Sequence, residues 1–426
     1  MTQQPWQDRL KFVIETAREL SAQTDPQEMV RKYGLRMRQV MPVDASVSLS
    51  RRGYQRPDVR VTRASIWGTD VNPWKQSGNL VVHHGGLFSE LIYGDDPVVI
   101  DDLQLAPDDP AAPFAAGMRS VMMIPLFDRG VALNAVVLMR REPNGFDRET
   151  LPERVQMSNL FGRATHNLVL AEQVKEAYEA LDREMQVVSN IQRSLLPAEL
   201  PCIPGVELAV HYQTSRRAGG DYYDFFPLPD GRWGILIADV SGHGTPAAVL
   251  MAVTHSIAHT YGGPPTPPAT LLDFVNRHLA DRYTNSNGTF VTAFYGIYDP
   301  RNREMVYASA GHLPPRVRRG DGANARIESA CLHNGLPLGI DADERYVDGV
   351  ARFAPGDLLV LYTDGITEAH REGDFDLFGC ERLDAALLAC RHSAGDAVEC
   401  ILRDVAHFTA GAAASDDQTL LAAAFT

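Results

Sequence analysis

The sequence predicts a mixed α/β protein with two domains joined by a long helix. Its 426 residues exceed what one hydrophobic core usually organises, so two domains of ordinary size are expected. The stretch from Arg163 to Leu196 contains neither proline nor glycine and is rich in helix-forming residues. Short apolar runs and helical patterns lie on both sides of it. We therefore expect an α/β domain over residues 1–150, a helical linker over 151–196 and a second α/β domain over 197–426.

The composition excludes several classes of protein. The chain is 45% hydrophobic and 22% charged, as ordinary globular proteins are, and it has no apolar run of the length that a membrane span needs. The first residues lack the pattern of a cleaved signal peptide, so the cytoplasm is the expected compartment. A net charge of -14 disfavours binding to nucleic acid. We expect partners that are neither nucleic acid nor membrane.

The N-terminal part begins with an amphipathic helical stretch and continues with short strand-like runs at Ala45–Leu49 and Val98–Ile100. Two apolar runs between Ser120 and Arg141 flank the turn Asp128-Arg129-Gly130, as in a β-hairpin. With Phe146 and the helix after it, this part resembles a GAF domain, and a PAS-like sensor is the alternative. The resemblance implies a sensor whose ligand could be a small molecule or a protein.

The linker pattern begins near Pro152, tolerates Gly162 and ends before Pro197. Its apolar positions fall alternately three and four residues apart, which is the seam of a coiled coil and indicates a parallel homodimer. The seam consists of Ala171, Val174, Tyr178, Leu181, Met185, Val188, Gln192 and Leu195. A helix packed on its own domain is the alternative interpretation. We expect the stretch IQRSLLP at the end of the linker to pack against the segment that carries Asp239.

Aspartates recur in the C-terminal half where apolar strands meet turns. The segment WGILIADVSGHG predicts a buried strand that ends at Asp239, followed by a glycine-rich turn and a helix capped by Thr245. The segment DLLVLYTDG places Asp364 at the end of another strand. Two further segments, AGGDYYDFF and SDDQTLLAAAF, supply Asp221, Asp224, Asp416 and Asp417. Each of these segments adjoins a predicted strand.

This set of acids predicts a metal site. With neither cysteine nor histidine at ligand spacing, the carboxylates form a hard oxygen site that suits Mg²⁺ or Mn²⁺ rather than zinc. Two ions roughly 3.5–4 Å apart could activate water and clamp a phosphoryl oxygen. A single aspartate before glycine is usually only a turn residue, but several acids at strand ends favour a site.

The order of these motifs resembles the PPM-type protein phosphatases, and within them the bacterial sporulation-phosphatase branch that regulates sigma factors. The resemblance runs from about Ile191 to Phe425 and is carried by IQRSLLP, GGDYYDFF, DVSGHGTPAAVLMA, FVTAFYGIYD, ASAGHLPP, LPLGI, LYTDGITEA and DDQT. It implies an α-β-β-α sandwich with a binuclear Mn²⁺ or Mg²⁺ site. It also implies a protein serine/threonine phosphatase that acts on a phosphorylated anti-sigma-factor antagonist.

The resemblance also implies roles for individual residues. The implied metal ligands are Asp221, Asp239, the carbonyl of Val240, Asp364 and Asp416. These residues would act in catalysis through metal-activated water.

Some residues near these ligands match the family's pattern less closely. Asp417 stands beside the ligands where eukaryotic members commonly have asparagine. Arg217 resembles a phosphate-binding arginine, although a solvated surface arginine is the alternative. Eukaryotic relatives have a candidate general acid where this chain has Ser241, so His243 is not assigned that role. His312 is interpreted as a structural histidine.

Two other functions remain as alternatives. The GGDYYDF segment superficially resembles the turn of diguanylate cyclases, but Tyr222 and Tyr223 stand where an acid would be needed. A phosphatase-like binding module without strong activity is the non-enzymatic alternative, and the presence of all matched carboxylates disfavours it. A cysteine-dependent phosphatase is excluded because no cysteine is followed by arginine at the spacing that such enzymes need.

Overall fold

The computed structural model describes residues 6–426 except 41, 68–70, 77, 79, 263–266, 286–287, 321–324, 331–332, 372 and 374. The chain divides into two compact units, Met1–Glu179 and Ala180–Thr426, and the helix α5 (Leu151–Leu195) belongs to both. Among the described residues, no helix combines the length and the apolar character needed to cross a bilayer.

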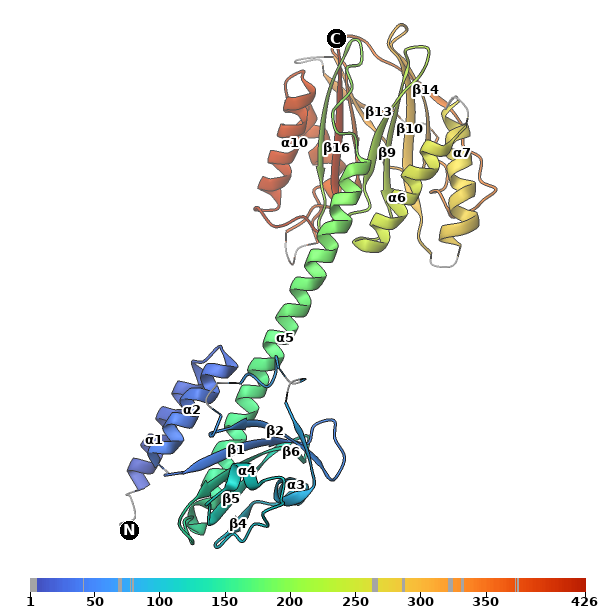
Figure 1. Ribbon diagram of the computed structural model, residues 1–426. Helices are drawn as coiled ribbons and strands as arrows, with labels where there is room; N and C mark the ends of the chain where they lie inside the picture. Colours follow the sequence, from blue (N-terminus) through green and yellow to red (C-terminus); the bar gives the residue numbers. More distant parts are fainter. Residues whose placement is uncertain are drawn as a thin grey trace. The chain divides into compact units, whose positions relative to one another are not determined.

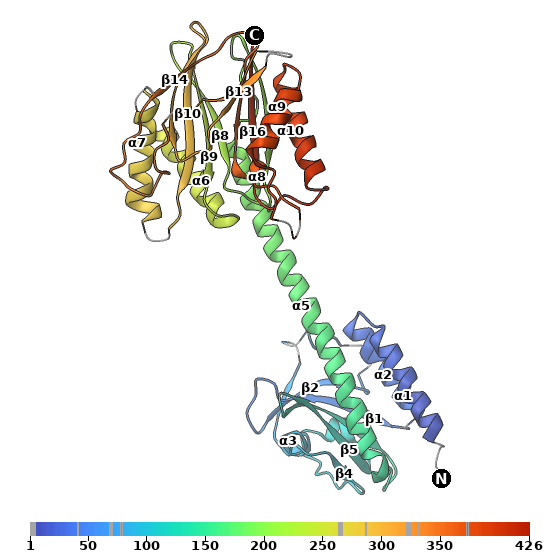
Figure 2. The same ribbon diagram turned by 180° about the vertical axis from the view of Figure 1, so that it is seen from behind.

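The N-terminal unit contains one antiparallel six-stranded sheet in the order β3-β2-β1-β6-β5-β4 (Figures 1 and 2). Its strands are β1 (Ala45–Ser50), β2 (Asp58–Ala64), β3 (Val82–His84), β4 (Val98–Ile100), β5 (Ser120–Asp128) and β6 (Val131–Arg140). Its helices before α5 are α1 (Trp6–Ser21), α2 (Pro26–Val40), α3 (Gly86–Tyr93) and α4 (Ala112–Ala115), with a 3-10 turn at Arg148–Thr150.

The predicted hairpin lies inside this sheet, between β1 and β4, and is confirmed. Strands β5 and β6 pair antiparallel, and the turn between them has positive φ at Arg129 and Gly130, as a two-residue hairpin turn requires. One face of the sheet packs on α3 and α4. The other face is covered by the beginning of α5, and Tyr33 of α2 stacks on Phe161 of α5 with ring centroids 3.9 Å apart.

The C-terminal unit contains two antiparallel five-stranded sheets, ordered β14-β11-β10-β9-β8 and β13-β12-β15-β16-β7. The strands are β7 (Val206–Gln213), β8 (Tyr222–Pro227), β9 (Trp233–Val240), β10 (Val291–Asp299), β11 (Glu304–Ala310), β12 (Arg316–Arg319), β13 (Arg326–Ser329), β14 (Gly349–Arg352), β15 (Leu358–Tyr362) and β16 (Gln418–Phe425). The helices are α6 (Thr245–Thr260), α7 (Pro268–Leu279), α8 (Asp364–Thr367), α9 (Gly379–Ala389) and α10 (Ala394–Phe408), with a π-helical turn at Ala280–Thr284.

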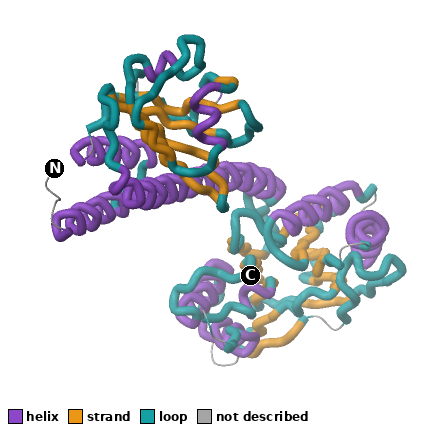
Figure 3. The backbone as a smooth tube through the Cα atoms, turned by 90° about the horizontal axis from the view of Figure 1, so that it is seen from below, coloured by secondary structure: helices purple, strands orange, loops and turns teal. Residues whose placement is uncertain are grey.

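Three apolar layers hold this unit together. The helices α6 and α7 pack on the outer face of the first sheet, through residues such as Met251 and Leu272. The two sheets pack on each other, and α9 and α10 cover the outer face of the second sheet. Helices therefore lie on both outer sides of the strands (Figure 3). The predicted α-β-β-α sandwich is confirmed.

The linker forms one 45-residue helix, as the sequence predicts, but the predicted seam divides into two parts. Val174, Tyr178 and Leu181 are 53%, 70% and 52% exposed. In contrast, Gln192 is 4% exposed and Leu195 packs against the core beside α6. The continuation of the seam through Gln192 and Leu195 is therefore wrong, because these residues face their own unit instead of a partner helix.

Candidate active site

The predicted acids lie where four strands begin or end. Asp221 immediately precedes β8, and Asp239 is the penultimate residue of β9. Asp364 follows β15, and Asp416 and Asp417 immediately precede β16. Because β8 pairs with β9 and β15 pairs with β16, these termini meet at one end of the sandwich. The site lies at the end opposite the C-terminus, since β16 runs from it toward Thr426 (Figure 1).

Two threonine hydroxyls orient the carboxylate of Asp221. The Thr363 hydroxyl donates to Oδ2 of Asp221 at 2.8 Å, and the Thr419 hydroxyl donates to the same oxygen at 2.6 Å. The backbone N–H of Thr419 also donates to the Thr363 hydroxyl at 3.0 Å. These bonds tie Asp221, from the first sheet, to two strands of the second sheet.

Asp417 anchors the loop that leads to Asp221. Its Oδ1 accepts from the backbone N–H of Ser215 at 2.7 Å, and its Oδ2 accepts from the N–H of Gly220 at 2.6 Å. The N–H of Asp417 in turn donates to Oδ1 of Asp416 at 2.8 Å. The carboxylate of Asp417 therefore binds the protein backbone and holds the loop from Ser215 to Gly220 in place.

Two glycines permit the close approach of these segments. A Cβ atom at Gly220 would lie 2.7 Å from the carbonyl oxygen of Val240. A Cβ atom at Gly365 would lie 2.0 Å from the carbonyl oxygen of Asp417. Both distances are far below van der Waals contact, so a larger residue would push Asp221 away from Val240, or Asp364 away from Asp416.

The carboxylates of the cluster repel one another, and this repulsion adds to the effect of burial on their pKa values. Burial raises the pKa of Asp239 to about 10, and Asp221, Asp364, Asp416 and Asp417 all add to this shift by repulsion. Burial likewise raises the pKa of Asp221 to about 8 and that of Asp364 to about 6. Each of these pKa values would return toward the ordinary range if positive charge stood among the carboxylates. The donor set consists of hard oxygens, so the residues fit divalent Mg²⁺ or Mn²⁺ ions.

The turn after Asp239 differs in one respect from the sequence prediction. Gly242 and Gly244 have φ of 89° and 78°, and α6 begins at Thr245 with Gly244 as its N-cap. Thr245 is therefore not the cap. Its hydroxyl contacts the sulfur of Met185 on α5 at 3.1 Å. His243 is exposed in this turn.

Arg217 does not face the acids in this structure. Its guanidinium group forms two hydrogen bonds with the carboxylate of Asp182 on α5, at 2.8 and 2.9 Å, and donates to Gln186 at 3.1 Å. The predicted phosphate contact would require this pair to open. His312 is buried, and its Nδ1 lies 2.9 Å from the hydroxyl of Thr292, the residue paired with Asp239 across β10 and β9.

Sequence reasoning missed the residues that orient the acids. Thr363 and Thr419 each stand close to an acid in the segments YTDG and DDQT, so hydroxyl residues beside the acids were the available signal. The heptad pattern predicts that Gln192 is a seam residue. Its side-chain amide instead donates to the carbonyl of Gly219 at 2.6 Å and accepts from the N–H of Gly219 at 3.1 Å. The end of α5 thus contacts the Asp221 loop.

The expectation that no histidine stands at ligand spacing is wrong. His255 and His259 lie four residues apart on α6, and the carboxylate of Asp224 faces both. Asp224 lies within β8 and not at its end, which separates it from the other acids.

The C-terminal part of the chain is similar to known proteins. Residues 229–426 match the family described as Stage II sporulation protein E (SpoIIE). The chain is 27% identical over 279 residues to Protein IcfG of Synechocystis sp., covering 60% of this chain and 43% of that protein. It is 29% identical over 224 residues to the phosphoserine phosphatase RsbU of Bacillus subtilis, covering 52% of this chain and 64% of RsbU. The chain thus spans less than two thirds of the length of these relatives.

Among solved structures, the SiaA-PP2C domain of Pseudomonas aeruginosa aligns with a TM-score of 0.49 and 21% sequence identity, covering 59% of this chain and 99% of that domain. The family match includes Asp239, Asp364 and Asp416 and begins after Asp221. Residues 229–426 are therefore similar to the SpoIIE family, and the chain is similar to the phosphoserine phosphatases RsbU and RsbP of Bacillus subtilis.

Proposed function

We propose that the chain is a metal-dependent protein serine/threonine phosphatase that dephosphorylates an anti-sigma-factor antagonist under the control of its N-terminal part. The observation that carries the proposal is the convergence of Asp221, Asp239, Asp364 and Asp416 at one end of the sandwich, where Asp239 is repelled by all the others. Such a set of acids is costly to bury unless cations neutralise it.

In this proposal the four carboxylates and the carbonyl of Val240 would hold two Mn²⁺ or Mg²⁺ ions. Bound there, the ions supply Lewis acidity for the phosphoryl oxygens and lower the pKa of water. The protein contributes rigidity. Thr363 and Thr419 fix the orientation of Asp221, and Asp417 holds the loop before it, so that little reorganisation is needed when the phosphate binds.

The substrate class is supported by the names of two relatives and by the binding energy that a folded substrate can supply. RsbU and RsbP of Bacillus subtilis are named phosphoserine phosphatases. A folded phosphoprotein offers contacts remote from the phosphate, and such contacts position the reacting group. We therefore expect phosphoserine or phosphothreonine on a folded antagonist to be hydrolysed much faster than small aryl phosphates.

The N-terminal control would act through α5. We assign residues 1–150 to a GAF-like sensor, 151–196 to the linker and 197–426 to the phosphatase domain. The exposed apolar residues Val174, Tyr178 and Leu181 would pair with the same residues of a second copy in a parallel homodimer. A ligand of the sensor, either a small molecule or a protein, would change how these helices pack.

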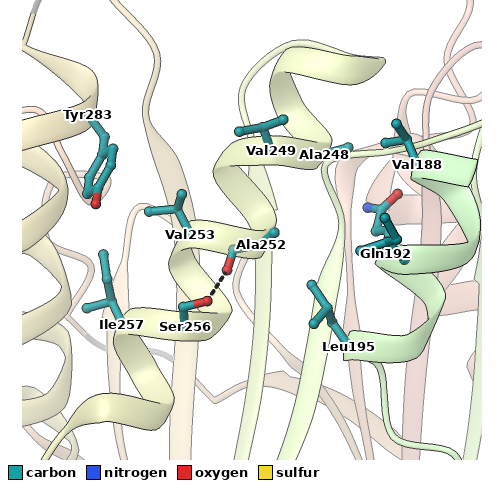
Figure 4. A pocket seen from close by; sticks show the side chains of 11 residues that line it. Val188, Gln192, Leu195, Ala248, Val249, Ala252, Val253, Ser256, Ile257 and Tyr283 are labelled. Atoms are coloured by element: carbon teal, nitrogen blue, oxygen red, sulfur yellow. Dashed lines mark hydrogen bonds between the residues drawn. The ribbon is translucent and has the colours of Figure 1, made fainter. Parts of the chain in front are cut away.

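The end of α5 has contacts through which such a change could reach the site. Gln192 holds Gly219 in the loop before Asp221, as described above. Beside it, α5 and α6 form an apolar groove of about 520 Å³, in which Val188 and Leu195 of α5 face Val249 and Val253 of α6 (Figure 4). Movement of α5 would alter both this groove and the loop.

A phosphatase assay on a phosphorylated antagonist, with Mn²⁺ and with a chelator, tests the proposal. We expect metal-dependent release of phosphate that is lost in Asp239→Asn and kept in Asp230→Asn. Asp230 is a matched control because it stands in the turn at the other end of the same pair of strands, in an exposed ion pair with Arg232.

The assay also separates the alternatives. Binding of the antagonist without hydrolysis would indicate a phosphatase-like binding module. Turnover of GTP would indicate a nucleotide cyclase. Either result would contradict the proposal.

A further inference from the structure

A second group of ligand-type side chains lies outside the acid cluster, between β8 and α6. It consists of Asp224 on β8 and His255 and His259 on α6. One ligand atom of each residue lies within 4.8 Å of the others. Oδ2 of Asp224 is 2.7 Å from Nε2 of His259 and 3.7 Å from Nδ1 of His255.

The spacing of the histidines suits a metal ion. Residues four apart on a helix lie on the same face, and two histidines at this spacing are a recurring zinc-binding arrangement. The two imidazole rings are 4.3 Å apart between centroids. Ligands of a tetrahedral zinc ion at about 2.0–2.1 Å would be separated by roughly 3.3 Å. The observed 2.7 and 3.7 Å lie on either side of that value, and the ligand atoms of the two histidines lie within 4.8 Å of each other.

Surrounding residues hold the three ligands in place. The hydroxyl of Tyr222 donates to Oδ2 of Asp224 at 2.5 Å and lies 2.9 Å from Nδ1 of His255. The ring of Phe226 packs against His259 with centroids 5.0 Å apart. A buried hydroxyl that orients a ligating carboxylate is the outer partner that metal sites usually have.

The site has one buried side and one open side. The side chain of Asp224 is 9% exposed and that of His255 is 18% exposed, whereas that of His259 is 44% exposed. An ion could therefore enter past His259, and water could complete its coordination from the same side. This mixture of two nitrogen donors and one carboxylate differs from the all-oxygen acid cluster.

We propose that Asp224, His255 and His259 form a binding site for Zn²⁺ that is separate from the Mg²⁺ or Mn²⁺ site of the phosphatase. For each imidazole the nitrogen that faces Asp224 must be unprotonated, so binding replaces the direct contact between His259 and Asp224 with coordination of both to the ion. The bound ion links β8, which follows Asp221, to the last turns of α6, whose first turn follows Asp239. It stabilises the layer on which the catalytic acids stand.

The test measures metal binding and does not depend on phosphatase activity. Metal-free protein is titrated with Zn²⁺ by calorimetry in the presence of excess Mg²⁺. We expect one Zn²⁺ ion per chain and an affinity at least ~10-fold weaker in Asp224→Asn, His255→Gln and His259→Gln, since even outer partners of metal sites contribute that much. The control His407→Gln, at an exposed position in the last turn of α10, should bind as the wild type does.

The substitution Asp239→Asn distinguishes the two metal sites. It should leave Zn²⁺ binding unchanged while it removes phosphatase activity. Loss of Zn²⁺ binding in Asp239→Asn, together with wild-type affinity in the three ligand variants, would place the ion in the acid cluster and overturn the proposal.

A variant that gains a new absorption band tests the proposal even if another ligand variant folds poorly. His259→Cys keeps a metal ligand, so its Co²⁺ complex should gain a near-ultraviolet thiolate-to-cobalt band that the wild-type complex lacks. Far-ultraviolet circular dichroism reports folding of each variant. Absence of that band in folded His259→Cys would contradict the proposal even if the other variants are unstable.

Discussion

Both units of this protein place aspartates at the ends of strands, but the surroundings of these aspartates differ. In the N-terminal unit, Asp128 ends β5 and forms an ion pair with Arg52 at 2.7 Å, which lowers the pKa of Asp128. In the C-terminal unit, Asp239 near the end of β9 is surrounded by other acids, and its pKa is raised to about 10. An aspartate at a strand end therefore indicates a metal site only when its neighbours are acids too.

The largest expected effect of this difference is on catalysis. Asp239→Asn or Asp364→Asn should lower phosphatase activity by roughly 10³-fold or more, about 4 kcal/mol of transition-state stabilisation, because an anionic ligand is lost while shape is kept. Asp128→Asn should leave activity unchanged. Single-turnover kinetics and calorimetry with Mn²⁺ measure both effects. Wild-type rates in Asp239→Asn would end the assignment of the site.

A second expected effect concerns the helix that the two units share. One residue inserted near Glu184 rotates the downstream part of α5 by about 100°, whereas seven inserted residues nearly restore the original face. We expect activity to change by roughly tenfold with one inserted residue and to stay near wild type with seven, since the rotation misplaces Gln192 against the loop before Asp221.

Activity assays and analytical ultracentrifugation of both insertion variants measure this effect. Equal activity in the two variants, or a wild-type protein that is monomeric at micromolar concentration, would rule out coupling through a dimeric helix.

A third expected effect is on stability in the absence of metal. The folded-state pKa of Asp239 is above its unfolded value, so its contribution to stability is lost as pH rises above about 4. At pH 7, Asp239→Asn should therefore raise the free energy of unfolding of the metal-free protein by about 1–3 kcal/mol.

Adding Mn²⁺ should reverse this order, because only the wild type retains the full set of ligands. Asp128→Asn should show no such reversal. Urea denaturation with and without Mn²⁺ provides the measurement, and the same order of stabilities in both conditions would argue against a metal site.

The last expected effect involves a buried histidine behind the site. Burial lowers the pKa of His312 to about 4, below its unfolded value near 6.5. The unfolded chain then binds more protons between these values, so stability falls as pH decreases from 6.5 to 4, by at most about 1.4 kcal/mol per pH unit. His312→Gln should reduce this slope, and His407→Gln, on the surface, should not. Unfolding measured at several pH values between 4 and 7 tests it.

The local elements of the protein could be predicted from its sequence because their signals are local. The hairpin of β5 and β6 follows from two apolar runs around Asp128-Arg129-Gly130, and α5 follows from a long stretch without proline or glycine. The positions of Asp221, Asp239, Asp364 and Asp416 next to strands follow from the same patterns.

The contacts of individual side chains could not be predicted in this way. Arg217 pairs with Asp182 rather than facing the acids, and Gln192 binds Gly219 rather than a partner helix. In both cases the partner lies about thirty residues away along the chain and is reached only through packing of the last part of α5 within the second unit. The charge of Arg217 and the heptad position of Gln192 do not identify these partners.

The sequence by itself determined where the candidate acids stand, since carboxylate side chains and strand-forming runs are encoded one segment at a time. Only the tertiary structure decided which charges meet. Antiparallel pairing brings Asp416 and Asp417 to the loop before Asp221, about 200 residues earlier, and packing of α6 on β8 gives Asp224 two histidines as neighbours. Whether a carboxylate is repelled, paired with arginine or able to share a metal ion depends on these distances, because electrostatic interactions act through space and not along the chain.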